Sequence, residues 1–119
     1  MRATTSPDAT EELAQFARSC DPEQLATVLT TLASKPRIEI IRLLSDGEDH
    51  DLGEIAAHVG ISKKNATRHL AHLEAIGVVA SSRRYPRSLT RLVEPRVLDV
   101  CRAAAAFLHP TESKPGGPA

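Results

Sequence analysis

The sequence predicts a mainly α-helical fold with one small β-hairpin, on three observations. Apolar residues recur at helical spacing over most of the chain. Between Asp51 and Gly77 this pattern forms two helices joined by a tight turn. After Gly77 the period changes, and two short segments rich in β-branched residues flank a turn at residues 85–87. The segment from Asp51 to Gly77 is the one around which the other elements are organised.

The first helix of this central pair carries capping signals at both ends. Asp51 is expected to cap its start, with Glu54 in the capping-box position. Gly60 follows as the left-handed residue that ends many helices. The apolar face is predicted from the helical spacing of Leu52, Ile55, Ala56 and Val59.

The second helix of the pair has an apolar stripe and a basic face. Ser62 is its predicted N-cap. Apolar residues at helical spacing make the stripe: Ala66, Leu70 and Leu73. Basic and polar residues point away from it: Lys63, Lys64, Thr67 and Arg68. Any two amphipathic helices can form a hairpin, but a basic second helix suits the major groove of DNA, and we interpret the pair as a helix-turn-helix.

Further helices flank the pair on both sides. Before it, helices are predicted over residues 10–20, from Pro22 to Leu32 and over residues 36–45. The helix over residues 36–45 is apolar almost all round, so we expect it to be a core helix. After it come the hairpin, with strands over 78–84 and 88–93, and a last helix over 95–109. Helices followed by a basic hairpin and a closing helix make a winged helix-turn-helix.

Charge is distributed unevenly along a chain whose formal net charge is zero. Between Ser62 and Arg91 there are seven Lys or Arg and one acid, Glu74. Between Asp46 and Glu54 there are five acids and no base. Positive charge confined to one stretch allows local binding to a polyanion, so we predict double-stranded DNA as the partner.

At 119 residues the chain is expected to form one domain. We predict a disordered N-terminal tail over 1–9, a DNA-binding and dimerisation domain over 10–109 and a flexible C-terminal tail over 110–119. A chain this short buries a limited core, and its first and last helices are expected to form a homodimer interface. No apolar run is long enough to cross a membrane and no signal peptide is apparent, which predicts a cytoplasmic protein.

The segments LASKPRIEIIRLLSDGE (32–48) and LGEIAAHVGISKKNATRHLAHLEAIGVV (52–79) resemble the ArsR-type (ArsR/SmtB-like) bacterial transcriptional regulators. The most specific part of the resemblance runs from Ala66 to Leu70 and continues through Leu73 to residues 77–79. It implies a homodimeric, cytoplasmic DNA-binding protein. Such proteins are usually repressors that a metal or another chemical signal releases from the operator.

Carried over by this resemblance, one set of residues faces DNA from the second helix of the pair: Ser62, Lys63, Lys64, Asn65, Thr67, Arg68 and His69. A second set lies in the hairpin, or wing: Arg83, Arg84 and Arg87. Arginines there would reach phosphates or an adjacent minor groove and position the protein without reading much sequence. The wing departs from the family pattern, because residues 85–88 read Tyr-Pro-Arg-Ser where relatives often have Gly.

The resemblance also points to a metal site on the last helix, where the family's best-known inducer site combines Asp-x-His from one subunit with His-x-x-Glu from the other. The similar residues here are Asp99, Cys101, His109 and Glu112, a set that would suit zinc, cobalt or nickel. The gap between the two halves is shorter than in the family, and Pro110 places Glu112 outside the helix. A second family site uses paired cysteines before the recognition helix, and the corresponding segment EDHDLGEI has none.

The two cysteines, Cys20 and Cys101, lie on apolar stripes expected to meet at the dimer interface. They could form a thiol switch, share a metal site, or be buried as small hydrophobic residues, and the sequence contains no sign of a lowered thiol pKa.

The function predicted from these features is sequence-specific transcriptional regulation, by a repressor that responds to a transition metal or a thiol signal. Two alternatives stay open: a winged-helix dimer that binds protein, and a metal-independent regulator that needs a partner protein. The lysines and arginines of residues 62–91 favour DNA, because protein interfaces are usually depleted in lysine. The sequence has no Gly-rich phosphate loop and no nucleophile elbow, so it does not predict an enzyme.

Overall fold

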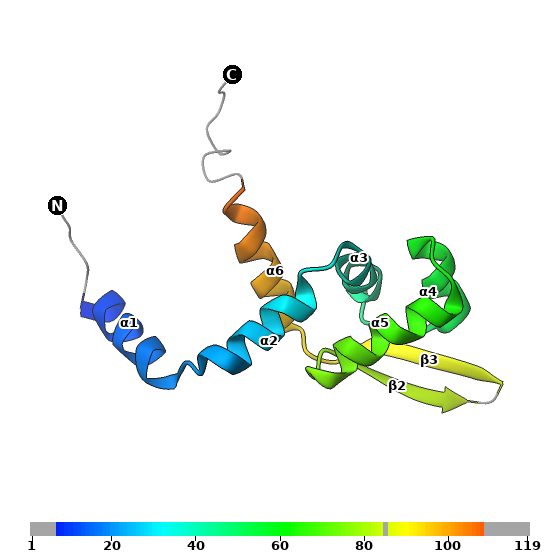
Figure 1. The fold of residues 1–119 in the computed structure, drawn as a ribbon, viewed down its shortest axis with the longest axis horizontal. Coiled ribbons are helices and arrows are strands. Elements are labelled where there is room, and N and C mark those ends of the chain that lie inside the picture. Colours follow the sequence, from blue (N-terminus) through cyan, green and yellow to red (C-terminus); the bar gives the residue numbers. More distant parts are fainter. Residues whose placement is uncertain (1–6, 85, 109–119) are drawn as a thin grey trace, which may run out of the picture. The chain divides into compact units, whose positions relative to one another are not determined.

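The computed structural model describes residues 7–84 and 86–108, and the chain forms two compact units, residues 1–30 and 31–119. The first unit contains α1 (Pro7–Ser19) and most of α2 (Pro22–Leu32). The second contains the helical pair, a small sheet and the last helix (Figure 1). The predicted C-terminal tail lies outside the described residues, and the grouping of residues 10–109 into one domain stays a prediction.

The first helix begins earlier than the sequence predicted. α1 starts at Pro7, so the predicted disordered tail is wrong for its last residues, 7–9. Proline is tolerated in a first turn because its missing N–H has no helical partner there, and Asp8 complements the positive end of the helix dipole. α2 begins as predicted, with Asp21 Oδ1 accepting a hydrogen bond from the Glu23 amide at 3.0 Å.

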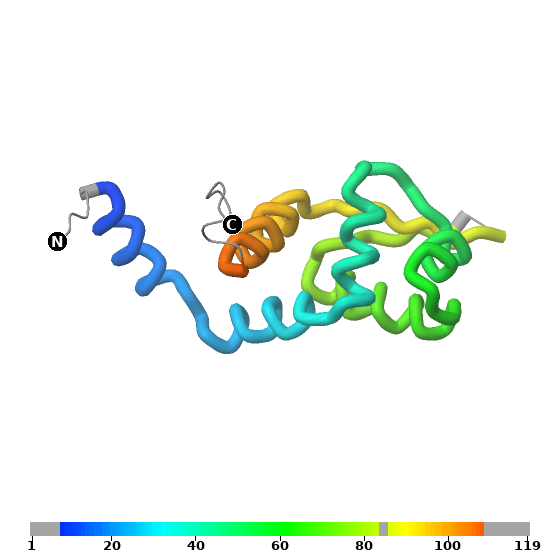
Figure 2. The backbone as a smooth tube through the Cα atoms, turned by 90° about the horizontal axis from the view of Figure 1, so that it is seen from above, coloured from blue at the N-terminus to red at the C-terminus, as the bar shows by residue number. Residues whose placement is uncertain are grey.

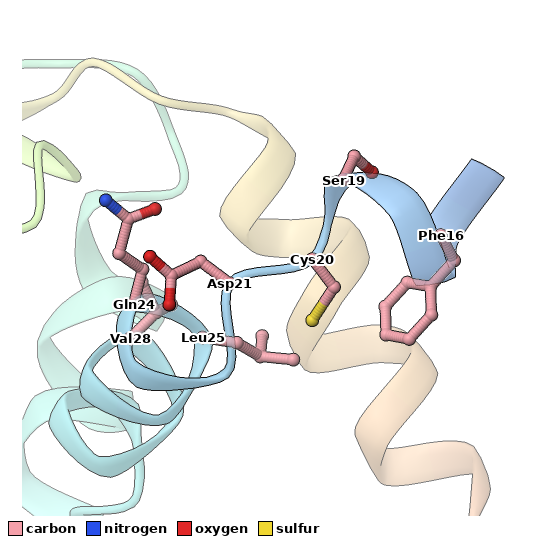
Figure 3. Close-up of a pocket in the computed structure, with 7 residues that line it drawn as sticks. All are labelled: Phe16, Ser19, Cys20, Asp21, Gln24, Leu25 and Val28. Atoms are coloured by element: carbon pink, nitrogen blue, oxygen red, sulfur yellow. The ribbon is translucent and has the colours of Figure 1, made fainter.

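The apolar stripes of the first unit are exposed in the single chain. Leu13 and Phe16 of α1 are 66% and 58% exposed, and Leu29 of α2 is 48% exposed. At the turn between the helices, a shallow pocket of about 350 Å³ is lined partly by Phe16, Cys20 and Leu25, whose side chains are drawn in Figure 3. The unit therefore has an apolar surface that it does not bury by itself.

The second unit has its core between three helices and a sheet. Its elements are α3 (Lys35–Leu44), β1 (His50–Asp51), α4 (Leu52–Val59), α5 (Lys63–Ala75), β2 (Val79–Arg84), β3 (Arg87–Leu92) and α6 (Arg96–Ala106). α3, α4 and α5 pack on one another and contact the strands (Figure 2). Their buried side chains include Ile40, Ile41, Leu44, Ile55, Leu73 and Val79. α3 is a core helix as predicted, although Ile38 on its outer side is 41% exposed.

The caps of the helical pair are confirmed. Asp51 Oδ1 accepts from the Glu54 amide at 2.8 Å, and Ser62 Oγ accepts from the Asn65 amide at 3.0 Å. Gly60 has a φ of 82°, in the left-handed region that ends α4. The Glu54 carboxylate, which a capping box would turn back to the Asp51 amide, instead lies 2.8 Å from His50 Nδ1.

The sheet has a third strand that the sequence did not predict. Its strand order is β1-β3-β2, with all pairs antiparallel. β1 has two residues in a segment whose sequence suggested an acidic loop, and the pairing of His50 with Thr90 and of Asp51 with Leu89 makes it a strand. β2 and β3 form the predicted hairpin, with Arg84 opposite Arg87, so the tip is one residue shorter than the predicted residues 85–87.

The last helix is shorter than predicted. α6 ends at Ala106, and His109 lies outside the described residues. Val97 anchors the helix in the core, whereas Val100, Phe107 and Leu108 are 40%, 84% and 77% exposed. Among the helices within residues 7–108, none is long and apolar enough to cross a membrane.

A buried histidine connects β1 to the turn after α3 and to α4. His50 is 8% exposed, and its Nε2 lies 2.9 Å from Asp46 Oδ2 while its Nδ1 lies 2.8 Å from Glu54 Oε2. Burial alone would lower the pKa of His50, but the hydrogen bonds to Asp46 and Glu54 outweigh it and raise the pKa. The pKa of Asp46 is lowered, first by its hydrogen bond from the Glu48 amide and then by His50.

These shifts predict how stability depends on pH. A raised histidine pKa stabilises the folded state below the unfolded-state value of about 6.5, and this contribution is lost as pH rises through the folded pKa. The lowered pKa of Asp46 affects stability at acidic pH, because the stability that the ionised carboxylate contributes is lost as pH falls below about 4. We therefore expect urea unfolding to show a larger loss of stability between about pH 5.5 and about pH 8.5 in the wild type than in His50→Gln. Parallel pH profiles for the two proteins would contradict this assignment.

Candidate nucleic-acid interface

The basic face of α5 lies on the surface, as predicted. Burial of its apolar stripe fixes the rotation of the helix, with Ala66, Leu70 and Leu73 at 0%, 7% and 0% exposure. The exposed residues of its N-terminal half are Ser62, Lys63, Lys64, Thr67 and Arg68. Arg68 Nη2 donates to Asn65 Oδ1 at 2.9 Å, so its guanidinium is held over the N-terminal half of the helix.

The wing adds a second set of cations. Arg83 is exposed near the end of β2, and Arg87 is exposed at the start of β3. Arg84 belongs to β2, and its side chain is not among the described parts of the structure. Arg91 on β3 is also exposed, and it belongs to the basic stretch but not to the predicted DNA-facing residues. Because neighbouring side chains of a strand point to opposite faces, Arg91 lies on the face of β3 opposite the buried Thr90.

Two shallow pockets join α5 to the wing. One, of about 320 Å³, is lined by Lys63 from the helix side and Arg87 from the wing side. The other, of about 380 Å³, is lined by Thr67 of α5 and Arg83 of β2. The structure therefore places two of the predicted helix residues, Lys63 and Thr67, in pockets that wing arginines also line.

Two arginines of β3 lie beside acidic residues. Arg87 Nη1 is 3.8 Å from Asp51 Oδ2, and Arg91 Nε is 3.5 Å from Asp49 Oδ1. Exposed ion pairs of this kind contribute little to stability and are screened by salt. The arginines can therefore exchange a carboxylate for a phosphate group at small cost.

His69 differs from the other predicted DNA-facing residues. It is half-buried, and its Nδ1 accepts a hydrogen bond from Arg37 Nε of α3 at 3.1 Å. Burial lowers the pKa of His69, and the nearby Arg37, Arg68 and His72 lower it further. One nitrogen of this imidazole is therefore engaged inside the protein, and a contact between His69 and DNA stays a prediction.

The metal site predicted on the last helix is only partly within the described residues. Asp99 and Cys101 lie on α6, whereas His109 and Glu112 lie outside the described part. Asp99 Oδ1 accepts from Arg102 Nη2 at 2.7 Å, which does not fit a carboxylate free to bind a cation. Within residues 7–84 and 86–108, no group of three or more His, Cys, Asp or Glu side chains could hold a metal ion. A zinc, nickel or cobalt response stays a prediction, and a zinc titration of the wild type against Cys101→Ser tests it.

The two thiols are half-buried and free. Burial raises the pKa of the Cys101 thiol, which disfavours the thiolate that a redox switch needs at neutral pH. Cys20 lines the pocket at the α1–α2 turn, and Figure 3 shows its sulfur beside the Leu25 side chain. These surroundings are typical of small apolar residues, and the thiol switch stays a prediction.

Comparison with known proteins agrees with this geometry. The family model described as bacterial regulatory protein, arsR family, matches residues 34–81. Rv0081 of M. tuberculosis is 28% identical with a TM-score of 0.67, over 79% of this chain and 96% of that one. The homodimeric winged helix-turn-helix DNA-binding domain of Mb0332 from Mycobacterium bovis is 26% identical with a TM-score of 0.63, over 73% and 83%. The transcriptional repressor BigR from Xylella fastidiosa shares the fold at 22% identity, with a TM-score of 0.65 over 82% and 94%.

A search of curated proteins gave no significant match. The matched residues 34–81 contain α3, α4 and α5, which are the core helix and the helical pair of the interface described above. The resemblance inferred from the sequence is therefore confirmed by the family model and by the fold. Residues 34–81 match the helix-turn-helix model of the arsR family of bacterial regulatory proteins, and the chain has the winged helix-turn-helix fold of DNA-binding transcriptional regulators.

Proposed function

We propose that the chain is a homodimeric, cytoplasmic repressor that binds a specific operator in double-stranded DNA. The observation that carries the proposal is that α5 and the wing share two surface pockets, one lined by Lys63 and Arg87 and the other by Thr67 and Arg83. α5 supplies side chains of the kind that read base edges in a major groove. The wing arginines supply contacts to phosphates, which hold the register of the complex.

The homodimer is supported by the exposed apolar residues of α1 and α6. Phe16 on α1, and Phe107 and Leu108 just after α6, are more than half exposed in the single chain. A symmetric dimer would bury such surface twice with the same set of contacts. The related domain of Mb0332 is homodimeric, which supports a homodimer here. BigR is a transcriptional repressor, which supports repression rather than activation.

A binding experiment tests the DNA part of the proposal. Fluorescence anisotropy is measured with a duplex from upstream of the protein's own coding sequence and with a scrambled duplex of equal composition, across a salt series. We expect tight binding to the first duplex only, with affinity falling steeply as salt rises because phosphate contacts release counterions. Equal and weak binding to both duplexes would reject the proposal and favour a winged-helix module that binds protein.

Sedimentation velocity tests the dimer. Phe16→Glu places a charge on the exposed apolar stripe of α1, and we expect this variant to shift toward monomer and to bind the operator duplex more weakly. Gln15→Glu adds the same charge at an exposed neighbouring position and is expected to remain dimeric. A dimeric Phe16→Glu variant would show that α1 lies outside the interface.

A further inference from the structure

One arginine connects the end of α2 to the recognition helix. Arg37, in the first turns of α3, donates from Nη1 to the Thr31 carbonyl of α2 at 2.9 Å. Its Nε donates to His69 Nδ1 of α5 at 3.1 Å. Both hydrogen bonds are partly buried, and the two acceptors come from different helices. A single side chain therefore spans the distance between α2 and α5.

The contact constrains the imidazole of His69 as well as its position. Because Nδ1 accepts from Arg37, a neutral His69 carries its proton on Nε2. Loss of the arginine would leave Nδ1 without this donor and would free the ring to turn. His69 follows Arg68 directly in α5, so a change at His69 is transmitted to the exposed basic face through the helix itself.

Thr31, which accepts one of the Arg37 hydrogen bonds, lies at the boundary between the two compact units. α2 is one continuous helix from Pro22 to Leu32, and the boundary between the two compact units falls within it, after Thr30. Thr31 is thus the first residue of the winged-helix unit. A hydrogen bond to its carbonyl holds the place where the chain enters that unit, and the same guanidinium holds α5.

We propose that Arg37 is a positioning residue for DNA recognition, which fixes α5 relative to the end of α2 by joining Thr31 to His69. This inference rests on the proposed function, because it assigns Arg37 to the operator-binding state. Arginine suits this role through its fork of donors, which can serve two acceptors at once. Lysine has the same charge but concentrates its donors on one atom, so it cannot serve both helices in this geometry.

Charge-conserving substitution provides the sharpest test. In Arg37→Lys we expect roughly tenfold weaker binding to the upstream duplex, the loss typical of one hydrogen bond to a charged group. Binding to the scrambled duplex is expected to stay within about twofold, because the net charge is unchanged. Arg42→Lys, on the exposed side of the same helix, is the matched control and should bind both duplexes as the wild type does.

Substitutions at His69 separate positioning from direct DNA contact. Asn places its side-chain oxygen near the position of Nδ1, so His69→Asn is expected to keep the acceptor and most of the affinity, whereas His69→Leu loses both. The double variant Arg37→Lys/His69→Leu should bind no more weakly than the weaker single variant, since both changes remove one contact. Additive losses would overturn the proposal, as would wild-type affinity in Arg37→Lys.

Hydrogen exchange gives a readout that does not depend on DNA. We expect the amides of α5 to exchange faster in Arg37→Lys than in Arg42→Lys, because α5 has lost its connection to Thr31. If the wild type did not discriminate between the duplexes, the proposed function would fail, and exchange would still decide the inference. Identical exchange of α5 in the two variants would overturn the positioning role.

Discussion

Replacing Arg68 by alanine is expected to abolish most operator discrimination while leaving the fold intact. Arg68 is exposed on the N-terminal half of α5, where its side chain donates a hydrogen bond to Asn65 Oδ1. Alanine favours helix, so the free energy of unfolding should change little. A bidentate arginine contact to a base is worth about 1–3 kcal/mol, and a homodimer would lose two of them. Anisotropy titration of the upstream and scrambled duplexes measures the loss.

The control for Arg68→Ala is Arg42→Ala. Arg42 is 75% exposed in its side chain and lies on α3, where its guanidinium is 3.6 Å from the Glu39 carboxylate. Both variants lose one positive charge, so a general electrostatic effect would weaken both equally. A specific contact predicts a large loss for Arg68→Ala alone. Normal operator binding by Arg68→Ala would show that α5 is wrongly assigned as the recognition helix.

Local signals explain why so much of the helical pair could be predicted. The caps at Asp51 and Ser62 and the left-handed Gly60 depend on residues within one turn of the chain. The stripe of Ala66, Leu70 and Leu73 follows from helical periodicity alone. Since these features fix both the position and the rotation of α5, they also placed the exposed basic residues correctly.

Contacts between distant segments explain what the sequence could not predict. β1 exists because His50 pairs with Thr90, and nothing within its own segment indicates a strand. His69 is separated by 32 residues from Arg37, so the periodicity of α5 could not reveal that its ring is engaged by α3. The capping-box position of Glu54 was correct, but a nearby histidine competes for the carboxylate. The β1 pairing and the Arg37–His69 hydrogen bond both join residues far apart in the sequence, which local patterns do not reveal.

Truncation of Leu73 should produce a large loss of stability in the second unit. The side chain is 0% exposed on the face of α5 opposite the basic residues, and α5 packs against both α3 and β2. Leu→Ala changes at such sites cost about 2–5 kcal/mol, through lost burial and the cavity that remains. Domains of this size have a total stability of about 5–15 kcal/mol, so one substitution removes a large part of it.

Urea unfolding at a fixed protein concentration measures this loss, because the stability of a dimer depends on concentration. His72→Ala is the matched control, since His72 is exposed on the same helix one residue before Leu73. We expect Leu73→Ala to lose operator binding as it unfolds, whereas Arg68→Ala loses binding while folded. A Leu73→Ala variant that unfolded at the wild-type urea concentration would show that the core of α3, α5 and β2 contributes little to stability, and that contacts between protomers supply most of it.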